Sequence, residues 1–105
     1  MLKLAAFTLL LAATPALAAP VDRATAVTTL AGFYYSADAC SLQISRAKVD
    51  AYAEANRPAG DTLFNVDVFR ATQALYAEHK DWSKDQLDAY CKTARQSVLK
   101  LGVTL

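Results

Sequence analysis

The sequence predicts an all-α protein, a small bundle of about four helices stapled by one disulfide between Cys40 and Cys91. Apolar residues recur along the chain at spacings of three and four, which is the period of a helix. Ser, Asp, Pro and Gly stand where such helices would begin and end. The chain has two cysteines, an even number. The expected helices span approximately residues 22–40, 45–56, 61–80 and 83–101.

Residues 1–18 carry the features of a secretory signal peptide. Lys3 supplies the positive charge, an apolar run follows, and Ala16-Leu17-Ala18 fits a small-residue cleavage site. The apolar run is shorter than the ~20 residues that a membrane-spanning helix needs. We therefore expect cleavage after Ala18 and no membrane attachment afterwards. The remainder, 19–105, would be a single helical domain. We expect export to the bacterial periplasm, with secretion from the cell as the alternative.

The first expected helix begins near Asp22 and reaches Cys40. Its apolar positions step by four and three, which places them on one face: Ala26, Leu30, Phe33, Ala37 and Cys40. The second begins after Ser45, a good N-cap residue. It ends by about Asn56, because Pro58 disfavours helical backbone in the residue before it.

The third expected helix opens at Asp61 and runs to about Lys80. Its first part contains a conflict, since Phe64, Val66 and Val68 alternate as they would in a strand. We expect a helix from Phe64 to Phe69 nonetheless, because no other run could pair with a strand there and a lone strand leaves backbone groups unpaired. His79 then lies near the negative end of the helix dipole, which it would stabilise. A pH switch is the alternative role for this single histidine.

The fourth expected helix has the clearest signals. Ser83 and Gln86 form a capping box, with Trp82 and Leu87 as the hydrophobic staple. Gly102 stands where a helix ends in left-handed backbone. The apolar face comprises Leu87, Cys91, Ala94, Val98 and Leu101.

The two cysteines fit a structural disulfide. Both lie on apolar faces of different helices, and a small exported domain is marginally stable without such a link. A redox-active pair would favour C-x-x-C spacing, which is absent. A nucleophilic pairing of Cys91 with His79 has no obvious orienting group.

Composition argues against several functional classes. The chain has 11 basic and 10 acidic residues, and cleavage removes Lys3, so the mature charge is balanced. Nucleic-acid binders normally carry a basic excess. Asp81, Asp85 and Asp88 could suggest a cation site, but Lys84 and Lys92 lie among them and indicate a solvated face. With no phosphate-binding loop, zinc spacing or catalytic serine motif, we expect no metal, no cofactor and no enzymatic activity.

Aromatic residues are the remaining candidates for function. Phe33, Tyr34 and Tyr35 are consecutive, so they cannot all face one core. Tyrosine and tryptophan are favoured at protein interfaces. A core and its rim are the alternative location. The candidate surface for a partner or ligand comprises Phe33, Tyr34, Tyr35, Tyr52, Tyr76, Trp82 and Tyr90.

The segments "ADACSL" and "DAYCKT" place two cysteines about fifty residues apart in a short exported chain. In this outline the chain resembles the HdeA-type acid-stress chaperones of the bacterial periplasm, a resemblance that implies no particular functional residue. Two hypotheses follow. The first is a non-enzymatic interaction protein with a protein partner or client, such as a stress chaperone or binding accessory. The second is a carrier of a small apolar ligand, bound in a groove between helices. The sequence leaves the oligomeric state open.

Overall fold

The computed structural model describes residues 21–105, which form four helices and contain no strand beyond one isolated bridge. The predicted all-α fold and the Cys40–Cys91 disulfide are confirmed. The predicted signal peptide, residues 1–18, lies outside the described residues. The helices are α2 (Arg23–Ala39), α3 (Arg46–Asn56), α4 (Phe64–His79) and α5 (Lys84–Leu101).

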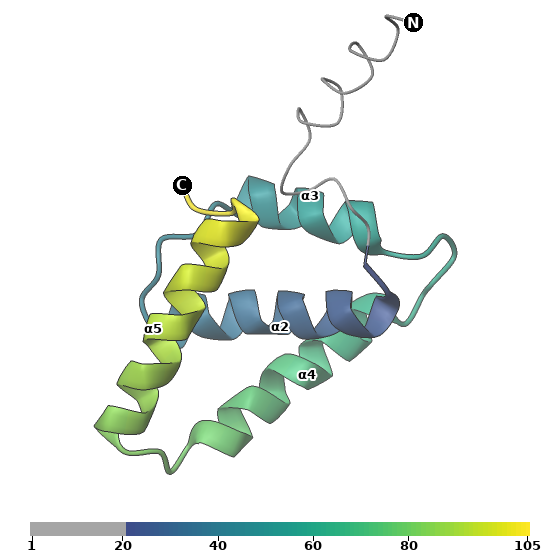
Figure 1. The fold of residues 1–105 in the computed structure, drawn as a ribbon. Coiled ribbons are helices and arrows are strands. Elements are labelled where there is room, and N and C mark those ends of the chain that lie inside the picture. Colours follow the sequence, from purple (N-terminus) through teal and green to yellow (C-terminus); the bar gives the residue numbers. More distant parts are fainter. Residues whose placement is uncertain (1–20) are drawn as a thin grey trace, which may run out of the picture.

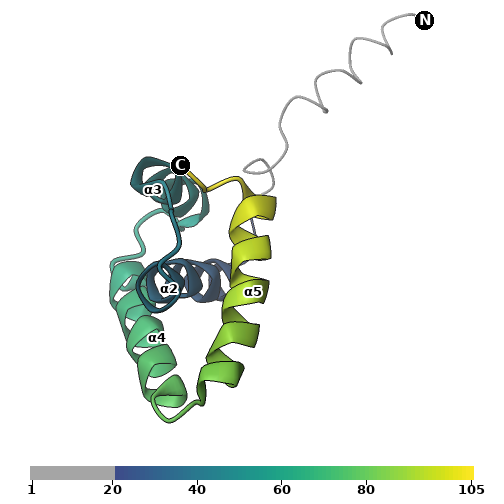
Figure 2. The same cartoon turned by 90° about the vertical axis from the view of Figure 1, so that its left-hand side faces the viewer.

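Helix α2 lies at the centre of the arrangement and packs against each of the other three helices. Figure 1 shows α3 and α4 on opposite sides of it. Figure 2 looks along α2. In this view α4 and α5 meet at their connecting turn and pass on opposite sides of α2. Because it has neighbours on several sides, α2 buries residues around much of its circumference: Ala26, Val27, Leu30, Ala31, Phe33, Tyr35 and Ser36.

The predicted starts of α2 and α3 are confirmed by their capping hydrogen bonds. The carboxylate of Asp22 and the hydroxyl of Ser45 each accept a hydrogen bond from the backbone N–H three residues further on, at 2.8 and 3.2 Å. Helix α3 ends at Asn56, two residues before Pro58, as predicted. The first N–H groups of a helix have no acceptor within the helix. A capping side chain that accepts from one of them therefore fixes where the helix begins.

Helix α4 begins at Phe64, three residues later than predicted. The side chain of Asp61, expected to open the helix, is engaged elsewhere. It accepts hydrogen bonds from the guanidinium of Arg23, at 2.5 and 3.2 Å, and from the backbone N–H of Leu63 at 3.1 Å. The residues from 61 to 63 therefore remain in the loop, and Leu63 precedes the helix without a side-chain cap.

The segment from Phe64 to Phe69 is helical, so the strand-like alternation is misleading. Phe64 and Val68, four residues apart, are buried in the core. Val66 is 41% exposed and Phe69 63% exposed. Burial thus follows the helical period rather than the alternation of two.

Helix α5 has both of its predicted ends. Ser83 and Gln86 form the capping box, with each side chain bonded to the backbone N–H of the other residue. Gly102 ends the helix with φ of 71°, left-handed backbone that suits glycine. The predicted apolar face is only partly covered: of its residues Val98 alone is buried, and Leu87, Cys91, Ala94 and Leu101 are half-buried.

Replacing the N-cap of α5 tests how much this local signal contributes. We expect Ser83→Ala to lower the free energy of unfolding by about 1 kcal/mol, because an N-terminal backbone donor loses its acceptor. Chemical denaturation at pH 7 measures the change. A difference within about 0.2 kcal/mol would mean that the cap contributes nothing measurable.

The residues after α5 pack against the segment before α3, a contact that the sequence did not indicate. After Gly102, Val103 is completely buried in the core. Its carbonyl accepts a hydrogen bond from the N–H of Ser45 at 2.8 Å, and Thr104 pairs with Ile44 in an antiparallel bridge. These contacts join the end of α5 to the start of α3.

Candidate functional site

The seven aromatic candidates divide between the core and the surface. Phe33, Tyr35 and Tyr52 are buried, as in the alternative location of a core and its rim. They belong to the packing around α2, where Phe33 and Tyr52 meet edge to face with ring centres 5.7 Å apart. Tyr34 and Tyr76 are exposed. Consecutive residues on a helix point about 100° apart, which is why Tyr34 alone of its neighbours faces outward.

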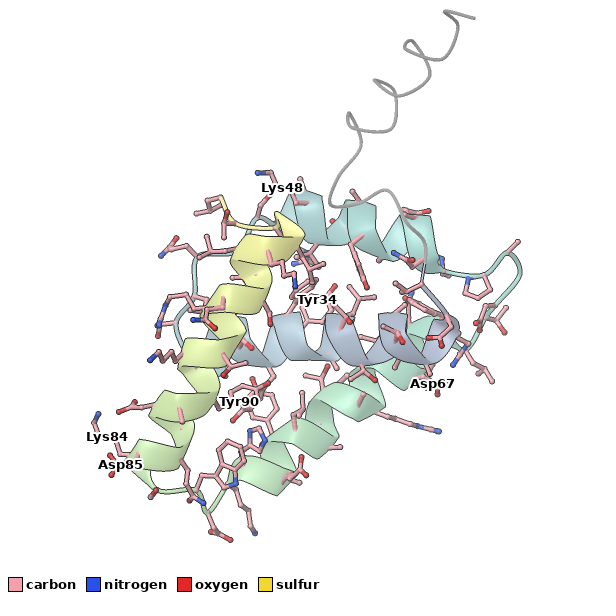
Figure 3. All side chains as sticks on the ribbon, viewed as in Figure 1. Tyr34, Lys48, Asp67, Lys84, Asp85 and Tyr90 are labelled. Atoms are coloured by element: carbon pink, nitrogen blue, oxygen red, sulfur yellow. A yellow bond between two sulfur atoms is a disulfide. The ribbon has the colours of Figure 1, made fainter. Side chains whose placement is uncertain are left out.

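Trp82 and Tyr90, both half-buried, pack around a buried His79. The imidazole stacks on the indole of Trp82, with ring centres 3.5 Å apart, and meets the rings of Tyr35 and Tyr90 edge-on at 5.0 and 4.9 Å. Figure 3 shows Tyr90 on the side of α5 that faces α4. His79 ends α4 as predicted, in the last turn of the helix, and it is also a buried packing residue of the α4–α5 corner. Its Nδ1 is the one buried side-chain polar atom of residues 21–105 that has no hydrogen-bond partner.

The disulfide joins the end of α2 to the middle of α5, with the two Cα atoms 5.5 Å apart. Both cysteines are in the disulfide, so Cys91 has no free thiol that His79 could activate as a nucleophile. A stable disulfide indicates an oxidising environment outside the cytoplasm.

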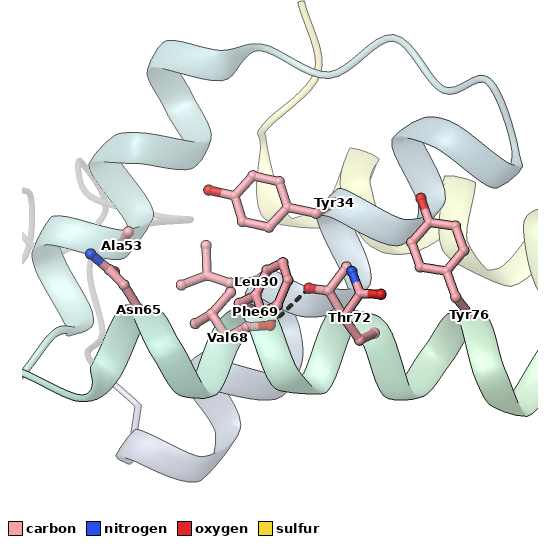
Figure 4. Close-up of a pocket in the computed structure, with 9 residues that line it drawn as sticks. Leu30, Tyr34, Ala53, Asn65, Val68, Phe69, Thr72 and Tyr76 are labelled. Atoms are coloured by element: carbon pink, nitrogen blue, oxygen red, sulfur yellow. Dashed lines mark hydrogen bonds between the residues drawn. The ribbon is translucent and has the colours of Figure 1, made fainter.

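An open groove of about 430 Å³ lies between α2, α3 and α4. Figure 4 shows its lining, with the ring of Tyr34 on one side and the side chains of α4 on the other. Hereafter this is called the α2–α4 groove. Nine residues line it, and none of them is charged: Leu30, Tyr34, Ala53, Asn65, Val68, Phe69, Thr72, Gln73 and Tyr76.

Helix α4 supplies most of the groove through one exposed face. Asn65, Phe69, Thr72, Gln73 and Tyr76 recur at helical spacings, so they lie along the same side. The hydroxyl of Thr72 donates to the carbonyl of the residue four positions earlier at 2.8 Å, the dashed line in Figure 4. The groove therefore offers an apolar and aromatic surface with a few neutral polar groups.

One end of the groove is fixed by a hydrogen bond between α4 and α2. The hydroxyl of Tyr76 donates to the carboxylate of Asp38 at 2.6 Å. This hydrogen bond, followed by burial, raises the pKa of Tyr76 above its usual value. The ring of Tyr76 also contacts Tyr35 edge-on, with centres 4.9 Å apart, which ties the groove to the core of the α4–α5 corner.

Sequence reasoning found only Tyr34 and Tyr76 among the groove residues. The spacing of Asn65, Phe69, Gln73 and Tyr76 was a usable signal, because it marks a second, partly apolar face of α4. The contributions of α2 and α3 could not be found this way, since they depend on how the helices cross.

A smaller hollow of about 230 Å³ lies between α2 and α5. Hydroxyl-bearing side chains are prominent around it, including Thr29, Ser36, Tyr90 and Ser97. The hydroxyl of Ser36 already donates to the carbonyl of Gly32 at 2.6 Å. This hollow provides a comparison site for binding experiments.

The acidic residues of α5 form no metal site in the described residues. No group of three or more His, Cys, Asp or Glu side chains within 21–105 is arranged to hold a metal ion. The carboxylate of Asp88 pairs with Lys84 at 2.8 Å, which raises the pKa of the lysine. Figure 3 shows Lys84 and Asp85 at the outward tip of α5.

A second charged cluster links the start of α2 to the loop before α4. Arg23 contacts Asp61 at 2.5 Å and Asp67 at 2.8 Å. Its guanidinium lies 5.8 Å from the centre of the Phe64 ring. Hydrogen bonding to Arg23 is the main cause that lowers the pKa of Asp61.

This lowered pKa predicts a pH-dependent loss of stability. The Asp61 carboxylate stabilises the fold above the usual aspartate pKa of about 4, and that contribution disappears as the pH falls through its lower folded-state pKa. Asp61→Asn should therefore lower the melting temperature at pH 7, with the gap to the original protein narrowing below about pH 4. Thermal melts from pH 7 to 2.5 measure this, with Asp50→Asn, in an exposed pair with Arg46, as the control. A gap that does not change with pH would contradict the assignment.

Two further findings bear on what the chain is. Within residues 21–105, no helix combines the length and the apolar character needed to cross a bilayer. No protein-family model, curated protein or solved structure matches this chain.

Proposed function

We propose that this chain is an exported, non-enzymatic binding protein that carries a small apolar ligand in the α2–α4 groove. The groove itself is the observation that supports the proposal. Its volume of about 430 Å³ falls among the volumes of small-molecule sites, about 300 to 1,000 Å³. Such sites also share its composition, a mostly apolar lining with a few polar groups.

The distribution of aromatic residues favours a ligand groove over a broad protein-binding surface. Of the seven candidates, the two that are exposed, Tyr34 and Tyr76, both line the groove. The other five pack in the core or around His79. A wide aromatic interface would need more of them at the surface.

The polar groups in the groove support binding rather than catalysis. Asn65 and Gln73 carry neutral amides, and the hydroxyl of Thr72 is engaged with the backbone. Amides neither donate nor accept a proton at neutral pH, as a general acid or base must. They can orient a polar end of a ligand by hydrogen bonding.

The cellular location belongs to the same proposal. A disulfide supports a site outside the cytoplasm, and the short, single-lysine leader supports a bacterial periplasm. Fractionation of a bacterial host with mass analysis is the test: a periplasmic form beginning at Ala19 is expected, and a cytoplasmic form retaining Met1 would contradict it.

Dye binding tests the groove directly. N-phenyl-1-naphthylamine, whose fluorescence rises in apolar surroundings, should bind the protein at pH 7.5. Phe69→Ser should weaken this binding about tenfold or more, since a large apolar wall of the groove is lost; tenfold corresponds to about 1.4 kcal/mol. Leu99→Ser is the matched control, because Leu99 is 62% exposed against 63% for Phe69 but lies on α5, outside the groove. No binding, or equal weakening by both variants, would contradict the proposal.

Client binding is the second candidate function, and one observation favours it. Leu63, Val66 and Phe69 are large apolar side chains exposed on and beside the start of α4. In acid, protonated carboxylates leave the basic groups to repel one another, which opposes the compact state. An acid chaperone would retain helicity, bind apolar dye and suppress aggregation of a model client at pH 2.5. A protein that remains fully native at that pH, or that opens without protecting the client, would rule this function out.

A further inference from the structure

A second hollow adjoins the α2–α4 groove on the other side of the Tyr34 ring. It has a volume of about 230 Å³ and lies between α2 and the beginning of α3. Tyr34 lines both spaces, so they meet at this residue. The lining comprises Phe33, Tyr34, Ala37, Ile44, Arg46 and Val49.

The side chain of Tyr34 lies at the surface and can change conformation. It is 37% exposed, and exposed side chains change rotamer on the picosecond to nanosecond timescale. Because both spaces meet at Tyr34, a change of its rotamer would allow one ligand to occupy the two as a single channel along α2. The channel would be longer than it is wide, which suits a linear ligand rather than a compact one.

The charges along this channel are asymmetric. The α2–α4 groove is lined by uncharged residues, and the adjoining hollow has a single charged residue, Arg46. Its side chain is 78% exposed, and its one ion pair is with Asp50 in the same helix, at 3.3 Å. Such an exposed pair contributes little stability. A guanidinium has five N–H donors, so Arg46 retains donors for a ligand carboxylate, which it can bind through two parallel hydrogen bonds.

We propose that the groove and the adjoining hollow bind one linear amphiphile of the fatty-acid class, with its carboxylate at Arg46. The alkyl chain lies past Tyr34 and along Leu30 and Phe69, where no charge opposes it. The carboxylate replaces Asp50 as the partner of the guanidinium. This inference rests on the proposed ligand-carrying function and names the ligand class.

The test compares two probes with the same alkyl chain, dodecanoate and 1-dodecanol, each displacing N-phenyl-1-naphthylamine at pH 8, the acid below its micelle concentration and the alcohol below its solubility limit. Dodecanoate should displace the dye at about one-third the concentration of the alcohol, the modest preference that an ion pair with an exposed arginine provides. Arg46→Gln should remove this preference by weakening the binding of dodecanoate more than that of dodecanol. Arg70→Gln, which removes an equal charge from the exposed side of α4, is the control and should change neither. Circular dichroism verifies that both variants fold.

The outcomes separate this inference from the function on which it rests. Equal displacement by acid and alcohol, or a preference that survives Arg46→Gln, overturns the carboxylate assignment while the groove stands. Loss of the preference in Arg70→Gln as well as in Arg46→Gln also overturns it, because a general charge effect then explains the result. If the original protein binds no dye, the groove function fails and this inference fails with it.

Discussion

Removing the disulfide is expected to lower the free energy of unfolding by about 4 kcal/mol, a large part of what a domain of this size possesses. The link closes a loop between Cys40 and Cys91, which are 51 positions apart, and so restricts the unfolded chain. It also anchors α5, whose own apolar face is buried only at Val98. Without it, the aromatic cluster at His79 and the contacts of Val103 remain as the main attachments of this helix.

Urea denaturation of oxidised and reduced protein measures the loss, with the Cys40→Ala, Cys91→Ala double variant as a check on reagent effects. Mass analysis without reductant should find no free thiol. One reactive thiol per chain, or equal stability of oxidised and reduced forms, would contradict the structural role.

Phe64→Ala is expected to lower the free energy of unfolding by about 3 to 5 kcal/mol, the usual cost of emptying a buried aromatic site. The ring is fully buried at the first turn of α4, within the same core cluster as Leu30, Val49 and Val103. Phe69→Ala, five residues further on the same helix, is the matched control. It should change stability by less than about 0.5 kcal/mol, because its ring faces the groove and solvent.

A second pair of substitutions tests the helical period of this segment. Val68→Ala should cost more than Val66→Ala, because Val68 is buried and Val66 is exposed. In a strand, Phe64, Val66 and Val68 would share one face and the two valines would cost about the same. Equal losses in chemical denaturation would contradict the helix.

The parts of the fold that were predictable from sequence are those set by local chemistry. Asp22, Ser45 and Ser83 each satisfy a backbone donor within three residues, so their sequence neighbourhood is enough to identify them. Pro58 acts through its fixed φ, and Gly102 through its freedom to adopt left-handed backbone. The disulfide followed from the two cysteines and their compartment.

The errors arose where a distant partner decides the outcome. Asp61 is a good helix-starting residue by itself, but Arg23, 38 residues earlier, engages its carboxylate and leaves it in the loop. The burial of His79 could not be predicted from its helix-terminal position, because it depends on Trp82, Tyr35 and Tyr90. Which of the consecutive aromatics of α2 are buried depends on the neighbours that this helix has on several sides, and the groove requires three helices to be placed together.

The most direct test of the central claim is to map the bound probe by nuclear magnetic resonance. Titration of isotope-labelled protein with N-phenyl-1-naphthylamine should shift the side-chain signals of Leu30, Tyr34, Phe69 and Tyr76 together, with a single binding constant. The α2–α5 hollow, reported by Thr29 and Ser97, should stay unchanged. Shifts confined to that hollow, or no saturable shift along the α2–α4 groove, would contradict its assignment as the ligand site.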